Sequence, residues 1–221
     1  MFPLRDSTPR HSFPFVNYVL IAVNAFVFLA QLSSPDPDAF VLNYAFIPSQ
    51  FNLLDPQSYV PIFTSIFVHG GFFHIISNMW FLHIFGDNVE DTLGHIPYFV
   101  FYLLGGLVAT LAQYFLYAGS NIPMIGASGA VSAIAGAYFV YFRRSSIKAL
   151  VTYVFVWQVV ELPVWFFLGY WFIIQVFSGV GSLVTLDVQT GGIAWFAHVG
   201  GFVFGYLISK IYAPKTHSFN V

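Results

Sequence analysis

A serine and a histidine lie inside apolar stretches that contain few other polar side chains. Ser128 lies in the sequence Gly126-Ala127-Ser128-Gly129 at the start of one apolar segment, and His198 lies within a later one. Polar groups at membrane depth are costly to keep there and usually serve a function. A serine hydroxyl is a weak nucleophile until a base accepts its proton, and histidine is the usual base. The pair therefore predicts a hydrolase whose active site lies within a membrane.

The residues around Ser128 suit stabilisation of the negative charge that develops when a serine attacks a carbonyl. If Ser128 begins a helix, free backbone N–H groups and the positive end of the helix dipole lie beside it. Gly126 and Gly129 tolerate unusual backbone angles and close approach. His74 and Asn78 share a helix face because they are one turn apart. Both side chains donate hydrogen bonds, so they are candidate donors to an oxyanion.

Each of these residues also has a simpler explanation. A serine in a membrane helix commonly bonds a carbonyl of its preceding turn, and a histidine in a span can be a proton relay or a contact between helices. His69 and His74 can be interfacial histidines at the entry to a helix. A metal site built from His69, His74, His83 and His198 is the weaker alternative, because His83 falls on roughly the opposite helix face from His74 and no carboxylate completes the set. We therefore expect no metal and no cofactor.

The composition is that of a membrane protein. Hydrophobic residues make up 58% of the 221-residue chain and charged residues 7%, whereas soluble domains carry about 25% charged residues. Mean hydropathy is +0.77. No cysteine is present, which excludes disulfides, thiolate nucleophiles and cysteine metal sites. No basic cluster indicates nucleic-acid binding, and Met1 to Pro14 does not have the pattern of a cleaved signal peptide.

A membrane helix requires about 20 apolar residues to cross the hydrocarbon core, and six apolar segments, some of them shorter, are predicted as spans. They are Phe15–Leu32, Phe72–Phe85, Ile96–Tyr117, Ser128–Phe142, Pro163–Phe177 and Gly192–Ile211. The predicted fold class is an all-α, polytopic bundle of six transmembrane helices. It comprises a short cytoplasmic segment over 1–14, a membrane domain over 15–211 and a short cytoplasmic tail over 212–221. We expect Ile147–Leu162 to be interfacial or partly re-entrant, with a seventh span as the alternative.

The charged residues orient this bundle. All 7 basic residues fall in three regions that six crossings place on one side, namely Arg5, Arg10, Arg143, Arg144, Lys148, Lys210 and Lys215. Under the positive-inside bias that side is the cytoplasm. The opposite side receives Asp36, Asp38, Asp55 and Asp187. We therefore expect both termini in the cytoplasm and, from compactness and charge bias, a bacterial inner membrane, with an organelle membrane as the alternative.

The expected depths of the two residues agree. At 1.5 Å per residue, the span from Ser128 to Phe142 is about 22 Å long, which is shorter than the hydrocarbon core of about 30 Å. Its Ser128 end then lies below the outer surface, and residues 119–127 must dip inward against protein or a wet cavity. His198 is expected about 10 Å below the outer end of its own span.

Small residues allow the helices of Ser128 and His198 to pack closely: Ser128, Ser132 and Gly136 on one, Gly201 and Gly205 on the other. No acidic residue lies in the spans at this depth, so we expect a dyad rather than a triad.

Three motifs together resemble the rhomboid family of intramembrane serine proteases, in its minimal bacterial-type six-helix form. They are Gly126-Ala127-Ser128-Gly129, then Ala197-His198-Val199-Gly200-Gly201 running on to Gly205, and His69-Gly70-Gly71 with His74 and Asn78, continued by Phe85-Gly86-Asp87-Asn88-Val89-Glu90. Their order and spacing resemble the family over nearly the whole chain from the first span onward.

The resemblance implies an intramembrane serine endopeptidase with Ser128 as nucleophile and His198 as general base. It implies an oxyanion hole formed by His74, Asn78 and the Ser128 backbone N–H, and a supporting role for His69 at the mouth of the site. The substrate is expected to be a transmembrane segment of another protein, cut near its outer end. The fifth span, with Pro163, Trp165, Phe166, Phe167 and Trp171, resembles the lateral gate of the family, although lipid-facing packing explains its aromatic residues nearly as well.

Two features depart from the family pattern. Many members carry an aromatic residue one turn after the serine, where it packs on the catalytic imidazole, but this chain has Ser132. His198 must therefore be held in another way. The first loop, Ser33 to Val68, lacks the Trp-Arg pair of some members, and Tyr44, Phe46, Phe51 and Tyr59 are the aromatic residues available to anchor it instead.

Two other functional classes remain for comparison. A catalytically silent rhomboid-like protein that binds membrane clients is the leading alternative, although such relatives typically lose the serine or the histidine. A small-solute transporter predicts inverted repeats with broken helices, and no convincing internal repeat is present. The sequence does not indicate an oligomeric state.

Overall fold

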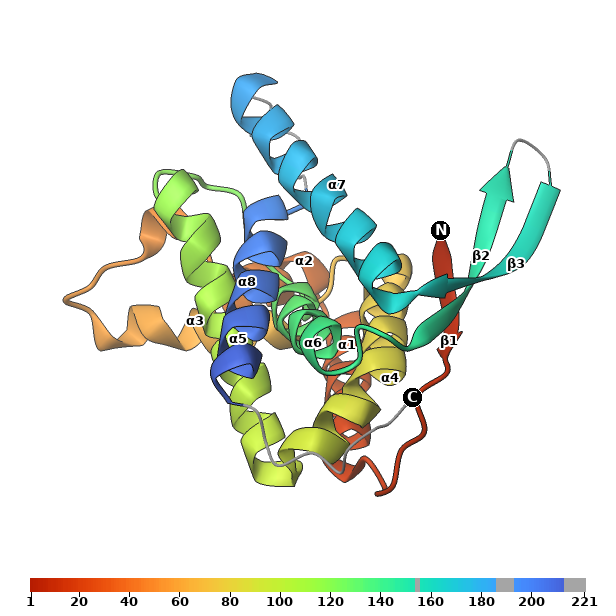
Figure 1. Cartoon of the computed structure of the whole chain (residues 1–221). Helices are drawn as coiled ribbons and strands as arrows, with labels where there is room; N and C mark the ends of the chain where they lie inside the picture. The colour runs from red at the N-terminus through yellow and green to blue at the C-terminus, as the bar shows by residue number, and fades with distance from the viewer. Residues whose placement is uncertain (154–155, 186–192, 213–221) are drawn as a thin grey trace.

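The computed structural model describes residues 1–153, 156–185 and 193–212, and it is helical with one small sheet (Figure 1). The helices are α1 (Phe15–Leu32), α2 (Pro37–Tyr44), α3 (Val60–Thr64), α4 (Phe72–Leu93), α5 (His95–Tyr117), α6 (Ser128–Tyr141), α7 (Val164–Thr185) and α8 (Trp195–Ile211), with short 3-10 turns at Pro48–Gln50, Pro56–Tyr59 and Ser65–Phe67. The strands are β1 (Phe2–Asp6), β2 (Ser146–Tyr153) and β3 (Val156–Pro163). The all-α prediction is therefore wrong in this one respect.

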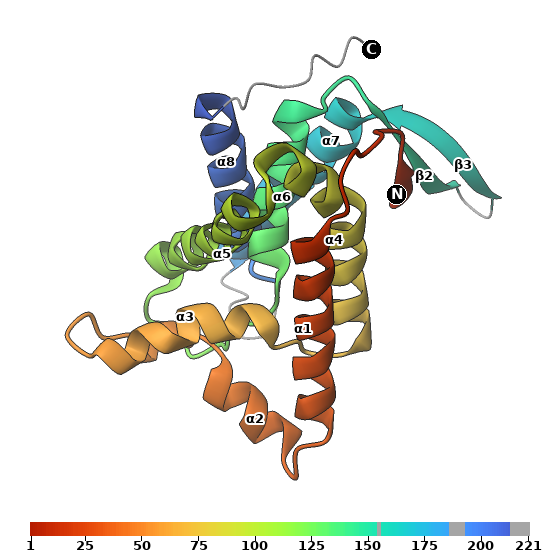
Figure 2. The ribbon, with the colours of Figure 1, turned by 90° about the horizontal axis from the view of Figure 1, so that it is seen from below.

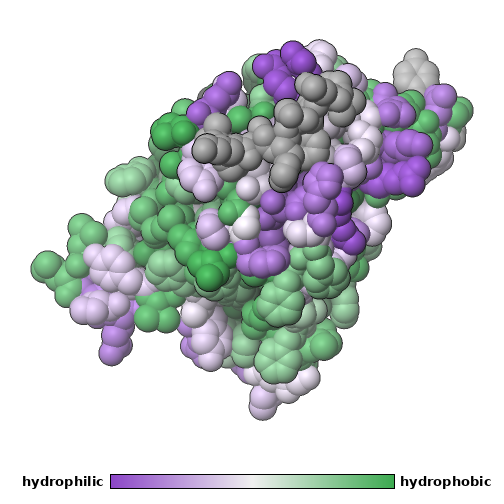
Figure 3. Space-filling view, turned by 60° about the horizontal axis from the view of Figure 1, so that its bottom comes forward, coloured by the Kyte–Doolittle hydropathy of each residue, from purple (hydrophilic) through white to green (hydrophobic). Residues whose placement is uncertain are grey.

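Each of the six predicted spans corresponds to one helix, but not every one of these helices is long enough to cross a bilayer alone. Three described helical stretches are long and apolar enough to do so: Phe15–Leu32, His95–Tyr117 and Val164–Leu183. A fourth crossing arises if Pro56–Phe67 and Phe72–Leu93, which meet at a bend of 82°, form one broken span. Large apolar side chains such as Phe26 and Phe115 are more than 70% exposed. Figure 3 shows broad apolar areas on the surface. The chain is an integral membrane protein.

Some of the predictions fall outside the described residues. These are Asp187, Lys215, the start of the last predicted span at Gly192, and the predicted tail beyond Tyr212.

The described residues of Ile147–Leu162 form two paired strands and not a helix, so the alternative of a seventh helical span is wrong. Strand β2 pairs with β3 in an antiparallel register that places Lys148 opposite Glu161. The amino-terminal strand β1 adds to the other edge of β2, with Phe2 opposite Leu150. The hairpin projects from the side of the bundle in Figure 1. The physical reason is that valine, threonine and aromatic residues, which dominate this segment, favour strands, whereas the prediction weighed only their apolar character.

Helix α6 is the centre of the bundle, and α8 packs against it backbone to backbone. A Cβ atom at Gly201 would lie 2.2 Å from the carbonyl oxygen of Gly129, and one at Gly205 would lie 1.9 Å from that of Ala133. On α6 itself, a Cβ atom at Gly136 would lie 2.2 Å from the Phe202 carbonyl oxygen. The predicted close packing of small residues is confirmed, and it brings the starts of α6 and α8 together.

A buried carboxylate joins α4 to the start of α1. Glu90 is 1% exposed, and its two oxygens accept hydrogen bonds from the backbone N–H groups of Val16 (2.9 Å) and Asn17 (2.7 Å). A carboxylate at a helix N-terminus satisfies free donors and complements the helix dipole. The motif that ends in Glu90 therefore fixes the angle between two long helices.

The first loop is anchored by aromatic packing, in the way that its composition suggested. Phe51 contacts Phe46, Tyr59 and Tyr114, with ring centroids 5.2 to 5.6 Å apart. Tyr44 packs on Phe40 instead. Figure 2 shows α2 and α3 lying across one end of the bundle, away from the amino terminus.

Candidate active site

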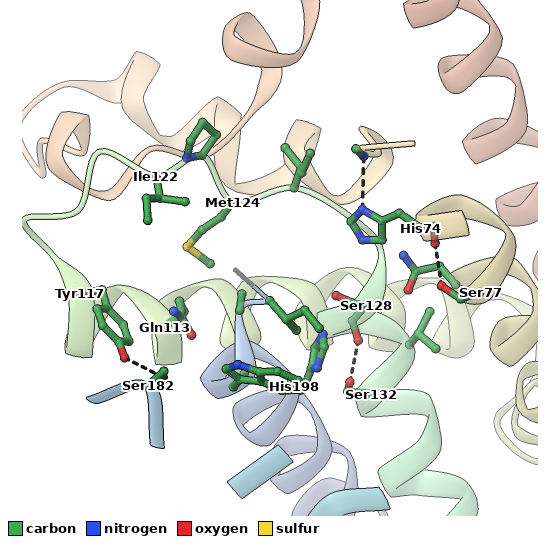
Figure 4. A pocket seen from close by; sticks show the side chains of 18 of the residues that line it. His74, Ser77, Gln113, Tyr117, Ile122, Met124, Ser128, Ser132, Ser182 and His198 are labelled. Atoms are coloured by element: carbon green, nitrogen blue, oxygen red, sulfur yellow. Dashed lines mark hydrogen bonds between the residues drawn. The ribbon is translucent and has the colours of Figure 1, made fainter. Parts of the chain in front are cut away.

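A cavity of about 1100 Å³ opens between helices α4 to α8 and the loop before α6. Its lining includes Ser128, Ser132, His74, Asn78, Trp171 and His198. Figure 4 shows Ser128, His74 and His198 gathered at one end of this cavity, with Gln113 and Tyr117 at the other. Helix packing thus brings side chains from helices α4 to α8 into one space.

Ser128 is the first residue of α6, and no side chain caps that helix end. The preceding loop turns inward, where its backbone groups find partners in the protein: Gly126 N–H donates to the Ser65 carbonyl (2.9 Å), and Met124 pairs with Phe46. The carbonyl of Ser128 accepts a hydrogen bond from the Ser132 hydroxyl at 2.6 Å. Among the described residues, the Ser128 hydroxyl itself has no hydrogen-bond partner. The simpler explanation of a helical serine expects its hydroxyl to bond a carbonyl of the preceding turn, and the Ser128 hydroxyl makes no such bond.

The His198 imidazole is held by helix α7. Its Nδ1 atom lies 2.7 Å from the Oε1 atom of Gln175. Trp171, one turn earlier on the same helix, stacks on the ring with centroids 6.0 Å apart and an interplanar angle of 30°. The aromatic side chain that packs on the His198 imidazole is thus Trp171 of α7, since α6 has Ser132 at the position where many family members carry an aromatic residue.

No hydrogen bond joins the Ser128 hydroxyl to the His198 ring in the part of the chain that the structure describes. Both side chains line the same cavity. Hydrogen bonds between catalytic groups are often long or absent before substrate binds, so the arrangement is compatible with a nucleophile and its base.

Two hydrogen-bond donors face the loop immediately before Ser128. His74 Nδ1 accepts a hydrogen bond from the Gly70 N–H at 3.2 Å, so a neutral ring carries its proton on Nε2. The Nδ2 atom of Asn78 is buried and has no partner. A Cβ atom at Gly126 would lie 2.5 Å from His74 Nε2 and 3.6 Å from Asn78 Nδ2. Both donors therefore point at the same place.

Asn78 is informative because a buried amide without a partner is costly. An unsatisfied buried donor lowers stability by about 1–3 kcal/mol, and such a group in a native protein calls for an explanation, of which a catalytic role is one. The donor lies at the cavity beside Ser128, where a substrate oxygen could accept from it.

His69 is fully buried beneath the loop and does not line the cavity. Its Nε2 accepts a long hydrogen bond from the Ala127 N–H at 3.4 Å, and its Nδ1 lies 3.3 Å from the Phe67 carbonyl. Gln31 holds the backbone of His69 by donating to its carbonyl at 2.8 Å. The residue thus lies behind the site rather than at its mouth, where the resemblance placed it.

The remaining predicted residues lie in two different places. Gly129 packs on α5, where a Cβ atom would lie 2.5 Å from that of Ala109. Trp165 and Phe166 are 51% and 41% exposed and lie outside the main cavity, whereas Trp171 lines it. Trp165 instead borders a smaller cavity with Arg143 and Arg144.

The histidines once considered as metal ligands do not form one cluster. His69 and His74 are neighbours, with ring centroids 5.1 Å apart, whereas His83 packs on Tyr18 and Trp80. The described residues bring no three His, Cys, Asp or Glu side chains together in a way that could hold a metal ion.

Gln175 is the residue of this site that the sequence interpretation missed. It lies between Ile173-Ile174 and Val176-Phe177, and it is 4% exposed. A polar side chain in such an apolar run was the available signal, because polar groups at this depth usually have a purpose.

Residues 56–215 match the Rhomboid domain family. The chain is 30% identical to RHOMBOID-like protein 1 of Arabidopsis thaliana over 72% of its length, and 28% identical to the mitochondrial RHOMBOID-like protein 6 of the same plant over 71%. It is 24% identical over 66% of its length to the mitochondrial presenilin-associated rhomboid-like protein of Bos taurus.

These matches cover 36%, 45% and 36% of the three relatives, so the chain spans less than half of their length. The Rhomboid match includes α4 to α8 and therefore every residue placed around the cavity from His74 to His198. This protein belongs to the rhomboid family.

Proposed function

We propose that this protein is an intramembrane serine endopeptidase that cleaves transmembrane segments of other proteins. The observation that carries the proposal is the meeting of an unbonded Ser128 hydroxyl, the His198 imidazole and the unpartnered Asn78 amide in one cavity. A nucleophile, a base and an oxyanion donor are the three parts that acyl transfer requires.

In the proposed reaction, Ser128 Oγ attacks the carbonyl carbon of the scissile peptide bond, and His198 Nε2 takes the hydroxyl proton. The carbonyl oxygen becomes an oxyanion that accepts hydrogen bonds from His74 Nε2–H, Asn78 Nδ2–H and the Ser128 backbone N–H. The intermediate then expels the amine of the substrate, which receives the proton from His198. A water molecule, deprotonated by the same imidazole, hydrolyses the acyl-enzyme and restores Ser128.

The substrate must present an exposed carbonyl to Ser128. In a transmembrane helix the carbonyls are bonded within the helix, so the segment has to unwind locally before attack. The cavity is large enough for an extended stretch of chain and is mostly apolar. We propose that Trp171 borders the substrate path, and that Trp165 and Phe166 form the lateral gate on the exposed face of α7.

The orientation belongs to the same proposal: six crossings, with both termini on the cytoplasmic side of a bacterial inner membrane. The relatives compared above are plant and mitochondrial proteins, so the choice of membrane rests on compactness and charge bias. Because the chain has no cysteine, single cysteines report orientation directly. A membrane-impermeant maleimide is expected to label Leu54→Cys in intact cells, and Phe13→Cys only after permeabilisation. Labelling of both in intact cells contradicts the orientation.

The activity is tested with a fluorophosphonate probe on the purified protein in detergent. We expect the wild type to be labelled, Ser128→Ala to be unlabelled, and the exposed-serine control Ser49→Ala to be labelled like the wild type. His198→Ala is expected to be unlabelled as well, because His74, the other histidine in the described lining of the cavity, is assigned to donate to the oxyanion and not to accept the Ser128 proton. Failure of a folded wild type to react, in a detergent where an active relative reacts, contradicts the proposal and favours a silent client-binding protein.

A further inference from the structure

We infer that Gln175 is a positioning residue for the reaction, and that it fixes the proton of His198 on Nδ1. This role rests on the proposed function, since it concerns the base of that reaction. It assigns to an uncharged amide on α7 the place that a carboxylate takes in a Ser-His-Asp triad.

The orientation of the Gln175 amide follows from its two contacts. Its Nε2 lies 3.3 Å from the carbonyl oxygen of Trp171, on the preceding turn of α7. A carbonyl oxygen only accepts hydrogen bonds, so the NH₂ group must face Trp171. The other atom of the amide, Oε1, is then the one that lies 2.7 Å from His198 Nδ1.

This orientation determines the tautomer of the imidazole. Because Oε1 only accepts, Nδ1 must be the donor and must carry hydrogen. A neutral imidazole has one N–H, so its lone pair is left on Nε2. The ring is therefore prepared to take the Ser128 proton at Nε2, and without the amide the proton is free to occupy either nitrogen.

Two further observations support this role for Gln175. Gln175 is 4% exposed, so its hydrogen bonds are protected from competition with water. Trp171 lies one turn away on the same face of α7 and stacks on the same imidazole. One helix face thus supplies both a ring contact and a hydrogen bond to the base, while α6 supplies no aromatic residue at Ser132.

An amide orients the ring and selects the tautomer, but unlike a carboxylate it carries no charge to stabilise the imidazolium that forms when His198 takes the proton. A glutamate at position 175 still offers an oxygen acceptor to His198 Nδ1. We therefore expect Gln175→Glu to keep the tautomer and most of the activity. Gln175→Leu, which has similar volume but no acceptor, is expected to lose both.

The test uses the full chain with ¹⁵N-labelled histidine, in detergent, and reads the ring-nitrogen resonances of His198, assigned by comparison with His198→Asn. The wild type and Gln175→Glu are expected to show a protonated Nδ1 and an unprotonated Nε2. Gln175→Leu is expected to lose this preference. Its fluorophosphonate labelling rate is expected to fall about 10- to 100-fold, the range found when a histidine that binds metal loses its outer hydrogen-bond partner.

Gln113→Leu is the matched control. Gln113 is a glutamine on α5 that accepts the Phe196 N–H at 3.1 Å and so supports the start of α8, where His198 lies, without contacting the His198 ring. Its replacement is expected to leave the His198 tautomer unchanged, because a purely structural effect on α8 does not select a ring nitrogen.

The outcomes distinguish the role of Gln175 from the function itself. A wild type that labels but carries its proton on Nε2 overturns the role of Gln175 and leaves the protease standing, whether or not Gln175→Leu folds. A folded Gln175→Leu variant with the wild-type tautomer and labelling rate overturns it too. A wild type that never labels overturns the proposed function and, with it, this role.

Discussion

A Cβ atom at Gly126 would lie 2.5 Å from Nε2 of His74, closer than Cβ atoms approach their neighbours in real structures. Gly126 also has a φ of +109°, a backbone conformation that residues with a side chain rarely adopt. The glycine therefore allows the loop to pass directly against the proposed oxyanion donors on its way into α6.

Gly126→Ala is accordingly expected to lower stability by about 1–3 kcal/mol, the range for a strained backbone position, and to displace either the loop or the His74 ring. Fluorophosphonate labelling is expected to fall with it. Gly119→Ala is the control, because a Cβ atom there has no neighbour within 4 Å and the backbone is not in the left-handed region. Equal behaviour of the two variants in thermal unfolding and labelling would contradict the close approach.

Asn78→Ala is expected to separate activity from stability. The Asn78 amide has no partner for Nδ2, so its removal should leave stability unchanged or raised, while cleavage slows about 100- to 1000-fold through loss of an oxyanion donor. Single-turnover cleavage and thermal unfolding measure the two effects.

Asn17→Ala serves as the opposite case. Its amide donates to the Leu82 carbonyl (3.1 Å) and accepts from the Tyr98 hydroxyl (2.7 Å), far from the cavity. We expect it to lose stability and to keep its activity per folded molecule. A loss of stability in Asn78→Ala as large as that in Asn17→Ala would argue for a structural amide at position 78.

Gly136→Ala is expected to force α6 and α8 apart. Its Cβ atom would lie 2.2 Å from the backbone oxygen of Phe202, which cannot move away as a flexible side chain can. Overpacking of this kind costs about 1–3 kcal/mol, and separation of the helices moves Ser128 away from His198. The same substitution at Gly169 of α7 meets only an ordinary contact at 4.0 Å. Labelling that survives in both variants would show that the glycine contact does not set the distance between the two residues.

Cleavage is expected to decline at acid pH in a single step. The base must be neutral to accept the Ser128 proton, so protonation of His198 removes activity as the pH falls. The other cavity histidine, His74, remains a hydrogen-bond donor when protonated, and no Asp or Glu lies in the described lining of the cavity to add a second acidic step. Initial rates between mildly acidic and alkaline pH, with folding monitored alongside, test this. A flat profile would remove His198 from the role of base.

The sequence by itself determined the helices and the chemistry-bearing residues, because both are written in local patterns. Apolar runs predicted helices α1 and α4 to α8. Most helix ends lie within a few residues of the predicted ones, and the exceptions are the carboxyl ends of α4 and α7. The small residues at Gly136, Gly201 and Gly205 predicted which helices meet, since a missing side chain is a property of one position. The same local reading named Ser128 and His198 as a pair.

Tertiary structure alone decided how that pair is held. The distant segment Phe2–Asp6 adds to the hairpin as a third strand, and the burial of His69 depends on Gln31 and on the loop before α6. Gln175 and Trp171 reach His198 only because α7 lies beside α8, and residues one turn apart on α7 then face one ring. No periodicity along the chain encodes such contacts, because they are set by how helices pack and not by where they begin and end.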